Sequence, residues 1–360
     1  MINSFPPTAI SRSEWGTVDG KQVWLFCLEN TRGTRIYCSN FGATVQSMFI
    51  ADPRGILADI LLGYEDLPGY INDLIYMGSV VGRFANRIAG EEVLIDDKRY
   101  RLATRPGGYH LHGGIEGFNK KVFDFEIIRG ENACIKFSYT SKHMEEGFPG
   151  NLSLEVIYTL SEDDSWIVEY KASTSQTTIV NLTQHAYFNL SGNLAGTIEE
   201  HELKINAQQY LPVNRLQVPT GDFGEVANTP FDFTDFKKIG LDITKADEQL
   251  LLSGGYDHSF ILEKKHTDSL KHAAVVHDPF SGRRMDVYST EPAVHFYSGN
   301  FINDVNGKNN ITYHNRSGFC LETQHFPDSP NHPHFPSTLL RPGEQFYSKT
   351  IFKFSLGDCN

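Results

Sequence analysis

The chain has 360 residues, of which 40% are hydrophobic and 21% are charged, and its formal net charge is −12. An acidic chain is poorly suited to nucleic acid or to an anionic membrane surface, so we expect neither as a partner. No segment reaches the roughly 20 apolar residues of a transmembrane helix, and the N-terminus has no signal-peptide pattern, so we expect a cytoplasmic protein.

Along most of the chain, apolar and polar residues alternate with the period of two that is typical of a half-buried β-strand. Helical periodicity is limited to residues 66–73 and 244–251. The pattern predicts a large antiparallel all-β fold with few short helices, in a single domain over residues 1–360. The long loops 192–237 and 303–315 are predicted to carry binding residues. Strands are expected at residues 21–28, 35–38, 43–50, 122–129, 133–141, 152–160, 166–172, 319–323 and 345–354.

One acidic residue stands out, because Glu322 lies in a strand pattern that is otherwise apolar and β-branched. Burial of such a carboxylate is costly unless it is paired or has a chemical role. A position on the solvated face of the strand is equally compatible with this segment alone. The strand is followed by the proline-rich residues 324–336, which cannot form a regular helix and are predicted to close over a pocket.

Two polar clusters lie in the first third of the chain. Asn86 and Arg87 belong to residues 78–90, whose glycine spacing fits no phosphate-binding loop. A plain surface position is the commoner outcome for an arginine. His110 and His112 are one residue apart, so a strand would place both on the same face. That spacing is compatible with metal ligation and with a purely structural role.

Two later segments also bring histidine and a polar partner together. If residues 181–192 form a strand, His185 shares one face with Thr183 and Tyr187, which makes it a candidate acid or base. Asp257 and His258 follow a pair of glycines, and a turn is expected to deliver them to the start of a strand.

These segments supply a glutamate, several histidines, an arginine, an aspartate and an asparagine, but no serine or cysteine nucleophile elbow. A carboxylate base opposite a histidine acid can transfer protons without a cofactor, and each contributes about 10²–10⁴-fold when it is well positioned. The residues by themselves therefore predict a β protein with a Glu/His proton-transfer site for a polar, neutral ligand.

A metal site is the alternative in the C-terminal loop, where three histidines lie close together: His325, His332 and His334. Their spacing lacks a carboxylate-anchored geometry, so we expect no metal there. The cysteines are scattered without a C-x-x-C pair, which argues against a disulfide framework and against a thiolate zinc site. They are Cys27, Cys38, Cys134, Cys320 and Cys359.

Taken together, the segments resemble the aldose 1-epimerase (galactose mutarotase) family over nearly the whole chain. Six motifs in order carry the resemblance, with a Leu-Arg-Pro-Gly-Glu run near the C-terminus. The motifs are Asn40-Phe41-Gly42-Ala43, Gly82-Arg83-Phe84-Ala85-Asn86-Arg87-Ile88, Leu111-His112-Gly113-Gly114, the Asn-Leu-Thr-Gln-His-Ala-Tyr-Phe-Asn-Leu run at 181–190, Tyr256-Asp257-His258 and Leu321-Glu322-Thr323-Gln324. The resemblance implies a β-supersandwich and an enzyme that interconverts the anomers of free hexoses without a cofactor.

The resemblance also implies the roles of the reacting groups. Glu322 is the general base that takes the proton of the anomeric hydroxyl, and His185 is the general acid that protonates the ring oxygen. The ring opens, the C1–C2 bond rotates, and closure gives the other anomer. His112 is implied to bind near the ring oxygen and the anomeric end. The implied partner is a small-molecule sugar, and we expect a monomer or a weak homodimer.

Asn86, Arg87 and Asp257 are implied to hold the remaining hydroxyls of the sugar, and His295 falls at a further sugar-binding position. The family commonly carries glutamine where this chain has His295, and asparagine where it has Tyr109. A glutamine offers a donor and an acceptor on a flexible chain, whereas a neutral histidine offers one of each on a rigid ring. We predict that these departures change the preferred sugar and leave the reaction type unchanged.

Two other functions remain open on the same fold. A hexose-6-phosphate mutarotase requires a basic phosphate pocket, which the acidic chain disfavours. A non-catalytic sugar-binding or regulatory protein is expected to lack the base or the acid, yet the chain has both Glu322 and His185.

Overall fold

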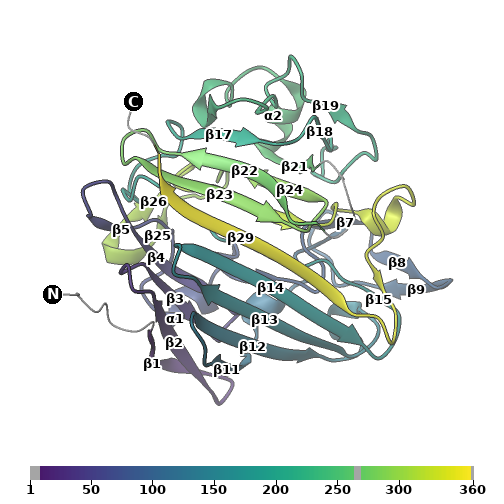
Figure 1. Cartoon of the computed structure of the whole chain (residues 1–360). Coiled ribbons are helices and arrows are strands. Elements are labelled where there is room, and N and C mark those ends of the chain that lie inside the picture. Colours follow the sequence, from purple (N-terminus) through teal and green to yellow (C-terminus); the bar gives the residue numbers. More distant parts are fainter. Residues whose placement is uncertain (1–8, 263–268, 358–360) are drawn as a thin grey trace.

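The computed structural model describes residues 9–262 and 269–357, and it consists almost entirely of β-sheet (Figure 1). One broad sheet dominates the view in Figure 1, and β29 crosses its middle. All pairings in this sheet are antiparallel. In spatial order the strands are β11 (Asp124–Ile128), β12 (Ala133–Ser141), β13 (Leu152–Leu160), β14 (Ser165–Thr174), β29 (Phe346–Leu356), β23 (Arg283–Ser289), β22 (Lys271–His277), β17 (Glu202–Ile205) and β20 (Lys237–Lys238).

Alternation along these strands builds the hydrophobic core. In β13, Leu154, Val156 and Tyr158 are almost completely buried, while their neighbours are more exposed. Trp166 of β14 stacks on Phe352 of β29, with ring centroids 5.2 Å apart. Burial of one large apolar side chain contributes about 1.5–3 kcal/mol. The buried face of the sheet carries many such side chains, and their packing holds the sheet against the layers behind it.

Two five-stranded sheets accompany the broad sheet. The first is a meander of the N-terminal strands β1 (Ala9–Val18), β2 (Lys21–Glu29), β3 (Arg35–Ser39), β4 (Val45–Ala51) and β5 (Leu57–Asp59). The second has the spatial order β19 (Gly224–Glu225), β18 (Gln209–Tyr210), β21 (Asp257–Ile261), β24 (Ala293–Tyr297) and β27 (Cys320–Gln324). This second sheet carries Glu322.

Short elements connect the sheets. Five two-stranded ribbons pair β6 (Val80–Val81) with β16 (Thr183–Gln184), β7 (Arg87–Ala89) with β10 (Tyr109–Leu111), β8 (Glu92–Ile95) with β9 (Lys98–Arg101), β15 (Thr178–Ile179) with β28 (Leu339–Leu340), and β25 (Val305–Asn306) with β26 (Thr312–Tyr313). The α-helices of the described residues are α1 (Leu67–Ile71) and α2 (Glu248–Ser253), and the 3₁₀ turns are Phe118–Lys120, Glu145–Gly147, Ile239–Leu241, Lys308–Asn310 and Ser329–Asn331. Within residues 9–262 and 269–357, no helix has the length and apolar character needed to cross a membrane.

The structure confirms the all-β fold and most of the predicted strands. The expected hairpins 21–28/35–38, 122–129/133–141 and 152–160/166–172 correspond to β2–β3, β11–β12 and β13–β14. The second helix begins later than predicted, because Asp247 caps it by accepting hydrogen bonds from the backbone N–H groups of Gln249 and Leu250. The predicted loop 192–237 is not wholly irregular, since it contains strands β17 to β19.

Candidate active site

Glu322 faces away from the broad sheet because of the alternation of β27. On one face of this strand Leu321 joins the core, and Thr323 forms a hydroxyl–hydroxyl hydrogen bond with Thr350 of β29. Glu322 and Cys320 therefore project from the opposite face. Glu322 is only 2% exposed, so a position on a solvated face of the strand is wrong.

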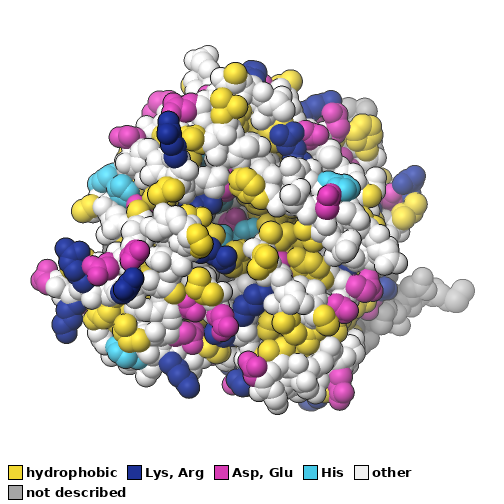
Figure 2. Space-filling view, turned by 180° about the vertical axis from the view of Figure 1, so that it is seen from behind, with side chains coloured by type: hydrophobic (Ala, Val, Ile, Leu, Met, Phe, Trp, Pro, Cys, Tyr) yellow, Lys and Arg dark blue, Asp and Glu magenta, His cyan; other side chains and the backbone are white. Residues whose placement is uncertain are grey.

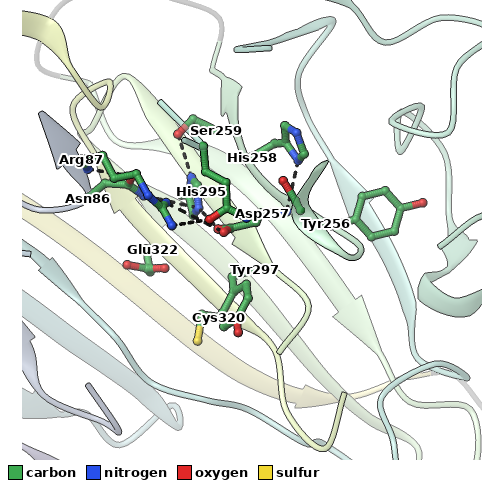
Figure 3. A network of polar contacts seen from close by, with 12 residues as sticks. Asn86, Arg87, Tyr256, Asp257, His258, Ser259, His295, Tyr297, Cys320 and Glu322 are labelled. Atoms are coloured by element: carbon green, nitrogen blue, oxygen red, sulfur yellow. Dashed lines mark hydrogen bonds and ion pairs between the residues drawn. The ribbon is translucent and has the colours of Figure 1, made fainter. Parts of the chain in front are cut away.

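The register of the second sheet aligns polar side chains beside Glu322. Ser259 of β21 lies opposite His295 of β24, and His295 lies opposite Glu322 of β27. The neighbouring row contains Asp257, Tyr297 and Cys320. Because residues opposite one another in adjacent strands share a face, both rows line the same space (Figure 3).

The carboxyl group of Glu322 is buried without a strong partner. Its Oε1 lies 3.7 Å from Nε2 of His185, and its Oε2 has no hydrogen-bond partner among the described residues. Burial raises the pKa of Glu322 well above its usual value, the charge of Asp257 adds to this, and Arg87 opposes it. A carboxylate in this setting is a stronger base than one in water.

His185 is held between aromatic rings directly after β16. Its backbone N–H donates to the carbonyl of Ser79, and its ring lies 4.9 Å from Tyr187 and 6.0 Å from Tyr76 between centroids. Burial lowers the pKa of His185 to about 4. Its Nδ1 is 3.5 Å from the thiol sulfur of Cys320, which can act as a weak donor or acceptor. The imidazole can therefore gain and lose a proton at Nε2, on the side of Glu322.

His112 differs from His185 because the backbone fixes its tautomer. Nδ1 of His112 accepts the backbone N–H of Asn86 at 3.2 Å, and the N–H of His112 donates to the carbonyl of Asn86 at 3.1 Å. Burial lowers the pKa of His112 well below its usual value, so the ring is neutral and carries its proton on Nε2. His112 is therefore a fixed hydrogen-bond donor beside His185, with their ring centroids 5.3 Å apart.

The prediction that His110 and His112 share a strand face is wrong. β10 ends at Leu111, and His112 takes a left-handed conformation with φ of 50°. His110 instead lies 2.7 Å from the carbonyl of Ala103, through Nδ1, and packs edge-on against Phe148. Of the two histidines, only His112 lies beside His185.

Arg87 and Asp257 form the other side of the site. The side chain of Arg87 is 12% exposed, so a plain surface position is wrong. Its Nη1 lies 3.9 Å from Oδ2 of Asp257, and its Nη2 hydrogen-bonds Gln217. The guanidinium also lies over the ring of Tyr109, 5.7 Å from the centroid. Asp257 begins β21 as predicted, whereas His258 points elsewhere and contacts Gln249.

His112, His185 and Glu322 are also the one group of described residues with the spacing of a possible metal site, since their ligand atoms lie within 4.8 Å of one another. A metal would need a lone pair on Nε2 of His112, but that atom carries the proton. The alternative metal site in the C-terminal loop is not supported. His325 is paired with Glu291 at 2.6 Å and His332 with Asp328 at 3.2 Å.

A hollow opens near the middle of the face seen in Figure 2. Histidine and acidic side chains are visible at its floor, and apolar and basic side chains surround them.

The sequence prediction missed several residues of the site. Ser259 and Cys320 each lie two residues from a predicted site residue on the same strand, so strand periodicity could have found them. Tyr76 lies outside regular strands and has a positive φ angle, and no periodic signal marks it. Gln217 lies in the loop 192–237 that was predicted to carry binding residues, but the sequence did not single it out. Cys359 lies outside the described residues, and the other four cysteines are free thiols.

Comparison with known proteins agrees with this geometry. Residues 25–353 match the model of the family described as aldose 1-epimerase. The chain is 41% identical to galactose mutarotase of Bos taurus over 89% of this chain and 91% of that one. It is 36% identical to aldose 1-epimerase of Escherichia coli K12, over 98% of this chain and 99% of that one. The structure of a galactose 1-epimerase from Lactobacillus acidophilus has a TM-score of 0.86, at 27% identity over 97% of this chain and 99% of that one. The chain belongs to the aldose 1-epimerase family.

Proposed function

We propose that the protein is an aldose 1-epimerase, or mutarotase, that interconverts the α and β anomers of free aldohexoses such as galactose and glucose. The observation that carries this proposal is a buried carboxylate beside a buried imidazole, since Oε1 of Glu322 lies 3.7 Å from Nε2 of His185 and no described residue hydrogen-bonds Oε2. Family membership supports the same reaction class.

In the proposed mechanism, Glu322 removes the proton of the anomeric hydroxyl and His185 donates a proton to the ring oxygen. The C1–O5 bond breaks, a free aldehyde forms, and rotation about C1–C2 presents its other face. Closure returns one proton to His185 and takes the other from Glu322, so the site ends with the protons it began with. Each group contributes about 10²–10⁴-fold when it is correctly placed.

Burial supports both transfers. The raised pKa of Glu322 makes its carboxylate a strong base, and the lowered pKa of His185 makes its imidazolium a strong acid. The same shifts make both groups neutral at rest, so the reacting pair forms when the proton of Glu322 passes to Nε2 of His185. After both transfers the two groups are neutral, which is the state that a buried site favours. We propose that the enclosed site thereby lowers the energy of the ring-opened intermediate relative to the closed sugar.

The other predicted residues have roles in binding. His112 offers its Nε2 proton to an oxygen at the anomeric end. Asn86 offers its amide, while Arg87 and Asp257 offer a donor and an acceptor to the more distant hydroxyls. None of these steps requires a cofactor.

Polarimetry of freshly dissolved α-galactose and α-glucose tests the proposal. We expect wild type to accelerate the approach to equilibrium and Glu322→Gln to lose nearly all of this effect, because an amide cannot accept the proton. Glu29→Gln is a matched control on β2, where Glu29 pairs with Arg35 on the surface. Normal activity of Glu322→Gln would refute the assignment of the base.

We further propose that the protein acts in the cytoplasm, as a monomer or weak homodimer, without nucleic acid or membrane partners. The net charge of −12 supports the last point. A single domain over residues 1–360 is also proposed, since one hydrophobic cluster includes both Phe26 and Phe354. Light scattering of the purified protein at several concentrations would test the oligomeric state.

A further inference from the structure

The position of His295 suggests a direct contact with the ligand, but its hydrogen bonds do not. Its side chain is 5% exposed. Nδ1 lies 2.9 Å from the hydroxyl of Ser259, and Nε2 lies 2.7 Å from Oδ1 of Asp257 (Figure 3). Both ring nitrogens therefore have partners within the protein.

The direction of these hydrogen bonds follows from the charge of Asp257. Burial opposes ionisation of this carboxyl, but the hydrogen bond from His295 and the charge of Arg87 outweigh it and hold the pKa of Asp257 at about 2. An ionised carboxylate can only accept, so Nε2 of His295 donates. In the neutral ring Nδ1 then accepts the hydroxyl proton of Ser259, and in the charged ring Nδ1 donates to the same oxygen. Either form leaves the imidazole without a free donor or acceptor.

Asn86 does not compete for Nε2 of His295. Its Nδ2 lies 3.4 Å from that atom, while its Oδ1 accepts the backbone N–H of Arg87 at 2.8 Å. This hydrogen bond fixes the orientation of the amide. Nδ2 of Asn86 is therefore a donor, and it faces Nε2 of His295, which is also a donor. Its protons stay available to a ligand.

Asp257 keeps one oxygen for a ligand. Oδ1 is held by His295, whereas Oδ2 lies 3.9 Å from Nη1 of Arg87, which is longer than a hydrogen bond. A hydroxyl between these two atoms can accept from Arg87 and donate to Asp257. If the contact with His295 is lost, the carboxylate can turn toward the guanidinium and close this space.

We infer that His295 is a positioning residue, which holds the carboxylate of Asp257 so that its free oxygen binds a non-anomeric hydroxyl of the sugar without touching the sugar itself. The inference rests on the proposed function for the identity of the ligand. It assigns His295 an indirect role where the sequence resemblance implied a direct contact.

Binding of 1,5-anhydrogalactitol tests this role apart from catalysis, because this analogue has no anomeric hydroxyl and cannot mutarotate. By calorimetry, we expect His295→Leu to raise its Kd at least about tenfold, the effect of losing a hydrogen bond to a charged group. His295→Gln can still donate to Asp257 and accept from Ser259, so its Kd should stay within about threefold of wild type. With galactose, KM should rise in His295→Leu while kcat changes much less, because the bound hydroxyl does not react.

A matched control exists on the broad sheet. His272 lies 2.9 Å from Asp286 and forms the same kind of pair between β22 and β23, away from the site. His272→Leu should leave the Kd of the analogue unchanged. Ser259→Ala is a smaller change that removes the hydroxyl partner of Nδ1, and we expect it to raise the Kd about two- to tenfold. Thermal unfolding of each variant reports whether it is folded.

Deoxygenated galactoses identify the hydroxyl that Asp257 binds. In wild type, removal of that hydroxyl should weaken binding, and in His295→Leu the same removal should have little further effect. The inference is overturned if removal of each sugar hydroxyl in turn weakens binding equally in wild type and in His295→Leu. An unchanged Kd in folded His295→Leu also overturns it, as does an equal loss in His295→Leu and His295→Gln. If His295→Leu does not fold, an unchanged Kd in Ser259→Ala overturns it.

The two proposals fail in different ways. If wild type binds the analogue and the variants differ as expected, yet galactose does not mutarotate faster, the proposed function is wrong and the role of His295 stands. If mutarotation is fast but the variants all bind alike and share one KM, the role of His295 is wrong and the proposed function stands.

Discussion

Mild acid is expected to destabilise the folded protein, because five histidines are buried in their neutral form. Burial lowers the pKa of each of them, to about 4 in three cases and to about 3 in one. In the unfolded chain, a histidine has a pKa near 6.5. The stability that these groups contribute is therefore present above about pH 6.5 and is lost as the pH falls toward 4. They are His110, His112, His185, His201 and His258.

The size of the effect follows from the protons taken up on unfolding. At pH 5 the five histidines bind about 4.5 more protons in the unfolded chain than in the native protein. Burial raises the pKa of Glu322, Asp73 and Asp328, so these carboxyl groups retain protons in the native state and oppose the loss by up to three protons. The free energy of unfolding therefore falls by about 2–6 kcal/mol for each pH unit near pH 5, whereas a typical protein has a total of about 5–15 kcal/mol.

Urea unfolding at pH 7, 6 and 5 measures this slope. His201→Gln removes one titrating group outside the site, where Nε2 accepts the backbone N–H of Leu190, and it should reduce the slope by up to about 1.4 kcal/mol per pH unit. A stability that stays constant from pH 7 to pH 5 would refute the claim that these histidines are neutral when folded.

Three further substitutions and one treatment have defined outcomes. Lys308→Met should lower the free energy of unfolding, measured in urea, by about 3–5 kcal/mol, since it leaves the largely buried carboxylate of Asp59 without its cation. Adding Asp59→Asn should recover part of the loss. Gly113→Ala should abolish activity, because the glycine has φ of 88° and a Cβ would lie 1.7 Å from the backbone oxygen of Gly82. Circular dichroism of the variant shows whether the whole protein misfolds or only the site is affected. Cys320→Ala should lower kcat about three- to tenfold by removing the partner of His185, while Cys320→Ser should retain most of it. Activity after dialysis against EDTA should equal that of untreated protein, and a loss restored by a divalent cation would contradict the metal-free mechanism.

The sequence predicted local pairings better than the arrangement of the sheets. Hairpins such as β13–β14 depend on a turn and on alternation, and both can be read from adjacent residues. The long strand β1 was missed because most of its residues are exposed on both faces, so it has no clear alternation. Nothing local shows that β29 lies between β14 and β23, because its pairing with both strands joins residues about 60–190 positions apart in the sequence.

For the site, the residue types were predictable but several contacts were not. Glu322 could be identified because a carboxylate in an apolar strand pattern is unusual, and the structure places it beside His185. The tautomer of His112 could not be predicted, since it depends on a backbone N–H from a segment 26 residues away. The partners of His295 were equally hidden, because Ser259 becomes its neighbour only through the pairing of β21 with β24.

The backbone determines how His112 and His185 differ in their ability to accept a proton. Asn86 and His112 both adopt left-handed conformations, with φ of 64° and 50°, which non-glycine residues rarely adopt and which cost about 1 kcal/mol or more each. This geometry directs the N–H of Asn86 at the ring of His112 and fixes the proton of that ring on the far nitrogen. In the part of the chain that the structure describes, no backbone N–H is directed at the ring of His185, whose Nδ1 lies beside the thiol of Cys320. The same strained turn prevents His112 from accepting a proton, so in the mechanism that we propose His185 is the histidine that exchanges one with the sugar.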